Sequence, residues 1–168
     1  MEKLDALRQV AEFHRTFGHP IEAEPVIPAE GRCRLRVALI AEELEELQEA
    51  IEQGDIVAVA DALCDIQYVL SGAVLEFGLG DKFKSLFDEV QRSNMSKTCK
   101  TLEEAEATVQ HYLETHGVEG YIRQEGPYYL VHRVADHKTL KSINYSPADL
   151  EGILKGANGQ GASGQKAS

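Results

Sequence analysis

The sequence predicts an all-α fold, an antiparallel helical bundle with a small β-hairpin appendage near residues 121–133. Two observations carry this expectation. Apolar residues recur at intervals of three and four through most of the chain before residue 118, which is the helical period. The two longest helical stretches are separated only by Gly54-Asp55, and helices joined by so short a turn pack antiparallel. With 168 residues, the chain is predicted to form one domain over residues 1–155.

The helices have recognisable start and stop signals. Gly18-His19-Pro20 ends the first helix, and the proline-bearing stretch after it is predicted to be an extended loop. Asp55 is placed to cap the third helix, and Thr101 with Glu104 forms a capping box before the fifth. The predicted helices span residues 4–17, 29–53, 56–77, 81 to the polar segment 91–97, and 102–117.

The segment after the fifth helix is predicted to contain a hairpin and to end in a tail. Tyr121-Ile122-Arg123 and Tyr128-Tyr129-Leu130-Val131 flank Glu125-Gly126-Pro127, a pattern that favours two short antiparallel strands. Residues 101–133 are a possible insertion in the helical domain. Residues 156–168 are mostly Gly, Ala, Ser, Gln and Asn, and a segment so polar is predicted to be disordered.

Two acidic clusters occupy consecutive helices. Glu42, Glu43 and Glu46 are neighbours on the second helix because residues three and four apart share a face, and Asp61 and Asp65 are neighbours on the third for the same reason. At about 100° per residue, Glu43 and Glu46 fall inside or at the edge of the apolar arc of their helix. The third helix is apolar on nearly every side, which is typical of a buried helix. Antiparallel packing is expected to bring the two clusters opposite each other.

Acidic side chains held together in a packed hairpin need a counter-charge, because like charges held close cannot all ionise cheaply. A divalent cation with oxygen ligands supplies that charge, and no set of Cys and His donors accompanies the acids. Two alternatives stay open, namely a solvated acidic face for the glutamates and pairing of the aspartates with Arg or Lys. A di-iron bundle uses Glu-x-x-His steps, and no histidine here has a Glu three residues before it. Mg²⁺ is therefore favoured.

Composition narrows the class of function. The 17 basic and 28 acidic residues give a net charge of −11, which disfavours nucleic acid as a partner. The charged N-terminus lacks a signal-peptide core, and Asp61 and Asp65 make membrane insertion of residues 56–77 costly, so no membrane partner is expected. Three widely spaced cysteines without a Cys-x-x-Cys pair fit a cytoplasmic location. The six histidines show no metal-ligand spacing and are expected in surface or packing roles.

The acidic pattern is similar to that of a known family. Glu42-Glu43-x-x-Glu46 followed by Asp61-Ala62-Leu63-Cys64-Asp65 resembles the MazG-type all-α nucleoside triphosphate pyrophosphohydrolases, relatives of dimeric dUTPases and phosphoribosyl-ATP pyrophosphohydrolase. Asn94-Met95-Ser96-Lys97 and the stretches 136–141 and 144–150 resemble one MazG-like branch. One position departs from the pattern. Where the family usually has Glu three residues before the final Asp, this chain has Ala62, and Asp61 could supply a carboxylate from the adjacent face.

The resemblance implies a hydrolase that cleaves an NTP or dNTP to the monophosphate and pyrophosphate. Mg²⁺, with Mn²⁺ as a substitute, would be bound by Glu43, Glu46, Asp61 and Asp65, and either Glu42 or Glu43 would orient the attacking water. Cations are also expected near the triphosphate. The candidate phosphate-binding residues are Arg92, Asn94, Lys97, Lys138 and Lys141. The aromatic residues Phe13, Phe17 and Tyr68 are candidates for either a base pocket or the core.

Other readings of the chain remain. One is a biosynthetic step like that of phosphoribosyl-ATP pyrophosphohydrolase, and another is a helical protein that binds a metal or a partner without catalysis. Because a single helical hairpin exposes apolar area, we expect a homodimer or a dimer of dimers with sites shared across the interface.

Overall fold

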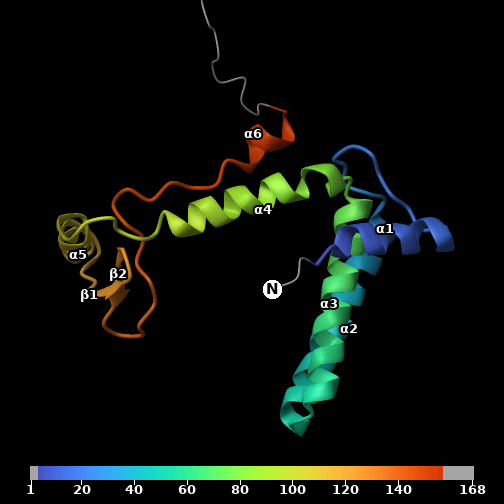
Figure 1. Ribbon diagram of the computed structural model, residues 1–168, viewed down its shortest axis with the longest axis horizontal. Coiled ribbons are helices and arrows are strands. Elements are labelled where there is room, and N and C mark those ends of the chain that lie inside the picture. Colours follow the sequence, from blue (N-terminus) through green and yellow to red (C-terminus); the bar gives the residue numbers. More distant parts are fainter. Residues whose placement is uncertain (1–3, 157–168) are drawn as a thin grey trace, which may run out of the picture. The chain divides into compact units, whose positions relative to one another are not determined.

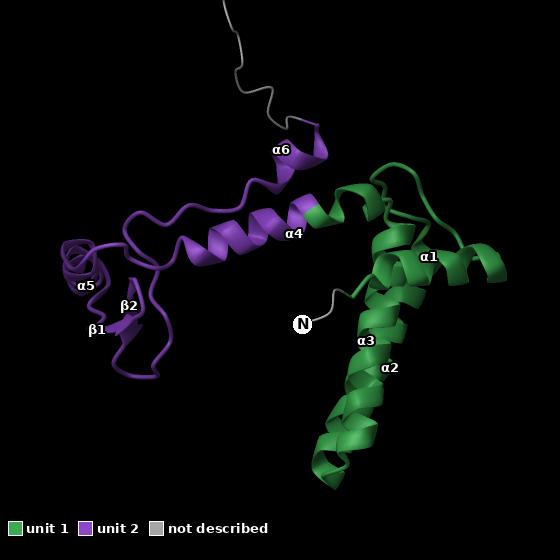
Figure 2. Ribbon diagram, in the orientation of Figure 1, with its two compact units in different colours: residues 1–84 green, residues 85–168 purple. Residues whose placement is uncertain are grey.

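The computed structural model describes residues 4–156, which fall into two compact units on either side of the boundary between Lys84 and Ser85 (Figure 2). The predicted disordered tail lies, except for Gly156, outside the described residues. The assignment of residues 1–155 to one domain, with an insertion at 101–133, stays a prediction.

The first unit is helical, as the sequence predicts. It contains α1 (Ala6–Phe17), α2 (Glu30–Gln53) and α3 (Ile56–Glu76), with α2 and α3 side by side as an antiparallel hairpin (Figure 1). The tight turn forms because Gly54 adopts a left-handed conformation with φ of 68°. Asp55 then accepts hydrogen bonds from the backbone N–H groups of Val57 and Ala58 at 2.9 and 3.1 Å, and so caps α3.

The proline-bearing loop between α1 and α2 is held against the end of α3. The backbone N–H of Glu22 donates to the carbonyl of Leu75 at 3.0 Å, and that of Val26 donates to Phe77 at 3.1 Å. Gly78 makes this approach possible. Its φ is 66°, and a Cβ added there would lie 1.9 Å from the Glu24 carbonyl oxygen. The loop is thereby fixed where it leads into α2.

Charged residues form part of the core between the three helices. Glu76 is 1% exposed, and its Oε1 accepts a hydrogen bond from Arg36 Nη2 at 2.6 Å, while its Oε2 accepts one from Arg32 Nε at 3.1 Å. Arg36 Nη2 also donates to His14 Nε2 at 3.1 Å. Since a guanidinium can only donate, His14 Nε2 must be the acceptor, and Nδ1–H donates to the Pro20 carbonyl at 2.8 Å. The structure therefore buries His14 as a neutral imidazole.

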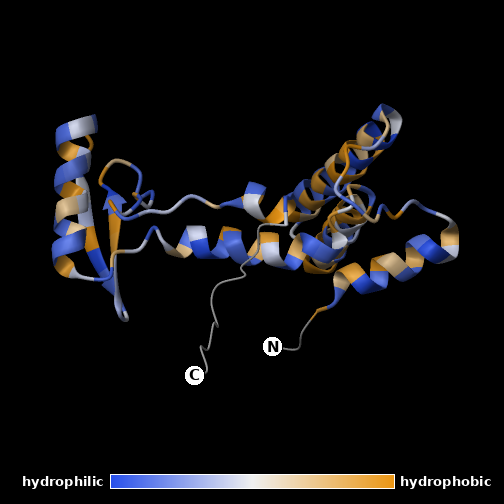
Figure 3. Cartoon of the chain, turned by 90° about the horizontal axis from the view of Figure 1, so that it is seen from above, coloured by the Kyte–Doolittle hydropathy of each residue, from blue (hydrophilic) through white to orange (hydrophobic). Residues whose placement is uncertain are grey.

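The expectation that residues 56–77 are buried on every side is wrong for the single chain. Ile56 and Val57 are each 75% exposed, and Leu63 is 52% exposed, although α1 and α2 pack on α3. Hydrophobic residues spread around the ribbons of the helical hairpin (Figure 3). By length and hydropathy α3 could cross a membrane, but Asp61 and Asp65 interrupt it.

The second unit contains most of α4 (Gly80–Met95), then α5 (Leu102–His116) and the predicted hairpin, β1 (Gly120–Glu125) paired antiparallel with β2 (Tyr128–Arg133). Its core is made by buried residues of α5, β2 and the flanking loops, namely Cys99, Ala105, Val131 and Leu140. The small sheet is thus an appendage to helices, as predicted. The short helix α6 (Leu150–Leu154) was not predicted.

Candidate functional site

The predicted acidic residues lie along the α2–α3 hairpin of the first unit. α2 carries Glu42, Glu43 and Glu46, and α3 carries Asp61 and Asp65. Glu43 is half-buried, and the other four are exposed. The two helices run in opposite directions (Figure 1), and the charge of Asp65 on α3 acts on Glu43 on α2.

The negative charges of the acidic cluster have their resolved effect on the pKa of Glu43. Its pKa is raised above the ordinary value of a glutamate, first by burial and then by the neighbouring negative charges. Asp65 contributes most among these neighbours, followed by Glu46, Glu42 and Asp61. All five predicted carboxylates therefore share one electrostatic environment, and two of them come from the opposite helix.

The chemistry of this cluster suits a hard cation, because its donors are all carboxylate oxygens. Within residues 4–156, no three Asp, Glu, His or Cys side chains are grouped closely enough to hold a metal as they stand. Four of the five acids are exposed and free to change rotamer about the half-buried Glu43. The residues thus fit a divalent cation by charge and by donor type.

Ala62, the position at which the sequence departs from the family pattern, is buried. It is 3% exposed, whereas the neighbouring Asp61 is exposed and has the smallest influence of the four acids on Glu43. Asp61 therefore reaches the cluster from its rim, and Asp65 is the main contribution of α3.

A cavity of about 200 Å³ lies in the same unit, and its lining residues Leu39 and Tyr68 are about one helical turn from Glu43 and Asp65 along α2 and α3. Phe13, Tyr68 and the buried residues His14 and Arg36 line it, while Phe17, also a sequence candidate for a base pocket, does not and is 65% exposed. Burial lowers the pKa of His14, more strongly than its hydrogen bond to Pro20 raises it. Sequence reasoning missed His14, Arg36 and Glu76. Arg36 lies 22 residues after His14 and 40 residues before Glu76 in the chain, and it contacts both.

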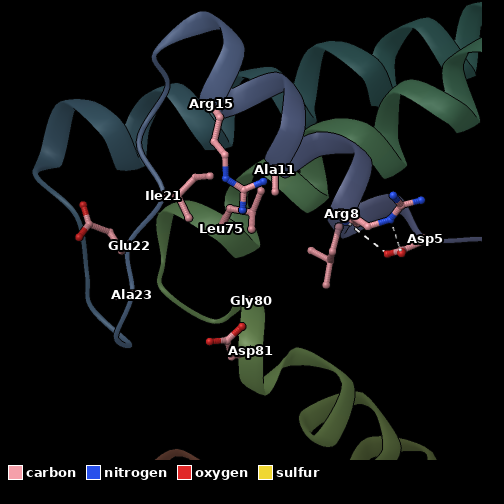
Figure 4. A pocket seen from close by; sticks show the side chains of 11 residues that line it. Asp5, Arg8, Ala11, Arg15, Ile21, Glu22, Ala23, Leu75, Gly80 and Asp81 are labelled. Carbon is pink, nitrogen blue, oxygen red and sulfur yellow. Dashed lines mark hydrogen bonds and ion pairs between the residues drawn. The ribbon is translucent and has the colours of Figure 1, made fainter.

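A larger cavity, of about 500 Å³, lies elsewhere in the first unit (Figure 4). It is bordered by Leu75 and Gly80, and Leu75 follows Asp65 by ten residues, about 15 Å along the helix. Its lining mixes arginines and acids, and Arg8 is already paired with Asp5 at 2.9 Å. This cavity is therefore separate from the acidic cluster.

The predicted phosphate-binding residues all lie in the second unit, where the structure brings three of them together. Lys97 Nζ donates to Asn94 Oδ1 at 2.7 Å, and Lys141 Nζ lies 4.3 Å from the centre of the Tyr145 ring. The pKa of Tyr145 is lowered, first by a hydrogen bond from Ser93 and then by the charges of Lys141 and Lys97. Tyr145, which the sequence analysis did not select, is thus the centre of this basic cluster.

Arg92 and Lys138 are each held by an acidic side chain, and Arg92 also interacts electrostatically with Tyr145. Arg92 binds Glu89 through Nε and Nη2 at 2.8 and 2.7 Å, and Nη2 also donates to the Pro147 carbonyl at 2.9 Å. The hydrogen bonds from Arg92 and then from the backbone N–H of Asp149 lower the pKa of Glu89 to about 2. Lys138 Nζ lies 3.6 Å from Asp136, which also binds Arg133. Phosphate binding by the five residues stays a prediction, and Arg92 and Lys138 have structural partners.

Comparisons with known proteins place the acidic hairpin in a family. The chain is 33% identical over 100 residues to "Uncharacterized protein L479" of Acanthamoeba polyphaga mimivirus, an alignment that covers 57% of this chain and 40% of that protein. The chain thus matches less than half the length of that relative. A sequence model of phosphoribosyl-ATP pyrophosphohydrolase matches residues 10–94, half of the chain, including all five acids of the cluster. The chain belongs to the phosphoribosyl-ATP pyrophosphohydrolase family.

Proposed function

We propose that this protein is a Mg²⁺-dependent pyrophosphohydrolase that cleaves an NTP or dNTP to the monophosphate and pyrophosphate. The observation that carries the proposal is the convergence of carboxylates from α2 and α3 around Glu43, in a chain of this family. An apolar helical hairpin gains nothing in stability from five acids at one place, because like charges repel. A reaction that needs a bound cation explains why these five acids lie together.

The residues take distinct roles in this proposal. Glu43, Glu46 and Asp65 hold the cation, and Asp61 and Glu42 complete its surroundings from the rim. Mg²⁺, or Mn²⁺ in its place, offsets charge on the phosphate oxygens and on the pyrophosphate leaving group. Either Glu42 or Glu43 orients the water that attacks the α-phosphorus.

The family match favours a second candidate function, hydrolysis of phosphoribosyl-ATP, because the matching model carries that enzyme's description. Hydrolysis of phosphoribosyl-ATP also yields a monophosphate and pyrophosphate. The two proposals differ in substrate, so parallel assays with phosphoribosyl-ATP and a panel of nucleoside triphosphates separate them. Release of pyrophosphate from phosphoribosyl-ATP alone would favour the second candidate.

The decisive experiment removes charge from the cluster without changing its shape. We expect the double variant Glu46→Gln, Asp65→Asn to lose pyrophosphate release in Mg²⁺, since one cation ligand from each helix becomes a neutral amide. Glu45→Gln is the matched control, because Glu45 is exposed and does not contribute to the pKa shift of Glu43. Activity that survives the double substitution would show that the site is wrongly assigned.

A non-catalytic protein that binds a metal or a partner is the remaining alternative. It predicts an intact fold, measured by circular dichroism, with no turnover of any triphosphate or of phosphoribosyl-ATP in Mg²⁺ or Mn²⁺. It also predicts that Mg²⁺ still raises the melting temperature. That combination of results would replace the enzymatic proposal with a binding function.

The exposed apolar face of the hairpin supports a proposal about assembly. Leu44, Ile51 and Leu63 are 59%, 61% and 52% exposed, a surface that a second copy of the chain would cover as a homodimer or dimer of dimers. Light scattering on a size-exclusion column tests it. We expect at least a dimer in the wild type and a smaller species for Leu63→Glu. A wild-type monomer at all concentrations would contradict the proposal.

A further inference from the structure

The cavity of about 500 Å³ in the first unit has the size and the apolar walls of a small-molecule site (Figure 4). Such sites usually measure about 300 to 1,000 Å³ and combine apolar walls with a few polar groups that fix the ligand. The apolar lining comes from α1, the loop after it and the end of α3, and its members are Leu7, Ala11, Ile21 and Leu75. Ala11 and Leu75 are buried, so the inner wall offers packing to the carbon chain of a ligand.

Backbone hydrogen bonds hold the walls of this cavity in place. The N–H of Glu22 donates to the Leu75 carbonyl at 3.0 Å, which joins the loop after α1 to the end of α3. The N–H of Leu79 donates to the Val74 carbonyl at 3.0 Å and fixes the turn that leads to Gly80, the first residue of α4. A cavity between fixed walls needs little ordering when a ligand enters, so less binding free energy is lost.

Charged side chains of both signs border the cavity, and some of them have no partner. Arg8 Nε binds Asp5 at 2.9 Å. Among residues 4–156, the side chains of Arg15, Glu22 and Asp81 have neither a hydrogen bond nor an ion pair. Arg15 points into the cavity from α1, and the carboxylate of Asp81 points toward the same space from α4, whereas that of Glu22 points away from Arg15 (Figure 4). One cation and one anion thus face the cavity unpaired.

We propose that this cavity binds a small aliphatic amino acid as its zwitterion. The guanidinium of Arg15 donates two parallel hydrogen bonds to the ligand's carboxylate, and the ligand's ammonium group donates to the carboxylate of Asp81. A simple anion would leave Asp81 unpaired, and a simple cation would leave Arg15 unpaired. A ligand with both charges satisfies both side chains while its carbon chain packs on Ala11 and Leu75. This site is separate from the acidic cluster and goes beyond the proposed function.

Two isomeric amino acids and their single-charge analogues test the proposal. L-Leucine and 6-aminohexanoate have the same composition and differ in the separation of their charges, so the tighter of the two reports the span between Arg15 and Asp81. The analogues of leucine are 4-methylpentanoate and 3-methylbutylamine, and those of 6-aminohexanoate are hexanoate and pentylamine. Binding is measured by calorimetry in buffer with EDTA. We expect one isomer to bind at least about tenfold more tightly than both of its analogues, the usual effect of a hydrogen bond between charged groups.

Two variants assign each charge of the ligand to one side chain. Arg15→Gln is expected to make the amino acid bind no better than its amine analogue, while the preference over the carboxylate analogue stays. Asp81→Asn is expected to do the reverse. Arg34→Gln and Glu12→Gln are the matched controls, because both residues are exposed and neither lines the cavity. All four substitutions are at exposed positions, and circular dichroism checks that the fold is intact.

The outcomes test this site independently of catalysis, because the measurement needs neither a cation nor turnover. A preference for the zwitterion that the two cavity variants remove in opposite ways would support the proposal. Absence of binding at millimolar concentration, equal binding of an amino acid and its analogues, or equal effects of the cavity and control variants would each overturn it. None of these results bears on release of pyrophosphate, so the proposed function stands or fails by its own assay.

Discussion

Replacing Gly72 with alanine tests whether the buried charges of the first unit are packed as the structure shows. Gly72 lies inside α3, four residues before its last residue, where propensity alone predicts that alanine would stabilise the helix by about 1 kcal/mol. The structure predicts the opposite sign. A Cβ at this position would lie 2.5 Å from Arg36 Nη1, 3.0 Å from Arg36 Cζ and 3.1 Å from His14 Nε2.

The guanidinium cannot move away without cost. Arg36 is buried, and its Nη2 is held by Glu76 at 2.6 Å, so any shift that admits the methyl group lengthens this ion pair. Overpacking of a core costs about 1 to 3 kcal/mol, and complete loss of a buried ion pair costs about 3 to 5 kcal/mol. Taking overpacking with part of the second cost, and subtracting about 1 kcal/mol for helix propensity, we expect Gly72→Ala to lower the free energy of unfolding by about 1 to 3 kcal/mol.

Urea denaturation followed by circular dichroism measures this change, and Gly31→Ala is the control. Gly31 lies in the first turn of α2, and a Cβ there would meet nothing within 4 Å, so this variant is expected to be neutral or more stable by up to about 1 kcal/mol. The same substitution should therefore have opposite signs at the two sites. If Gly72→Ala were as stable as the wild type, or more stable, the reasoning about Arg36 would be refuted.

Three further predictions concern charge. Because the folded-state pKa of His14 lies below its ordinary value of 6.5, the free energy of unfolding should fall as the pH drops below about 6.5, and His14→Gln should flatten this dependence in denaturation at several pH values. Glu43→Gln should raise the free energy of unfolding by a few tenths of a kcal/mol in EDTA, as the like charges around it predict; a loss of stability would contradict the shared environment. Mg²⁺ at ten times its dissociation constant should stabilise the wild type by about 1.4 kcal/mol, and an equal gain in Glu46→Gln, Asp65→Asn would place the cation elsewhere.

Local signals in the sequence predicted the elements well. The turn at Gly54 and the cap at Asp55 depend on residues within one helical turn of each other, and both form as expected. The capping box at the start of α5 is confirmed in part, since Thr101 Oγ1 accepts from the Glu104 backbone N–H at 3.2 Å. The five-residue helix α6 is too short to show a period, which is why it was missed.

Contacts between residues that lie far apart in the chain could not be predicted from the sequence. The acidic residues of α2 and α3 could be placed together because one tight turn fixes their pairing. Glu76 is the last residue of an apolar helix, and the sequence around it gives no sign that its side chain is buried. In the structure it is 1% exposed and bound by Arg36, which lies 40 residues earlier in the chain. Arg92 was selected as a free cation for the same reason, and its engagement with Glu89 and Pro147 appears only in three dimensions.

Two of the three thiols give the molecule an internal reporter of local opening. Cys64 on α3 is exposed, whereas Cys99 in the second unit is completely buried against Val131 and its neighbours. A thiol reagent added to the folded protein should modify Cys64 at once and reach Cys99 only when the second unit opens. The delay between the two reactions would therefore measure how long β1, β2 and α5 stay packed together in the second unit.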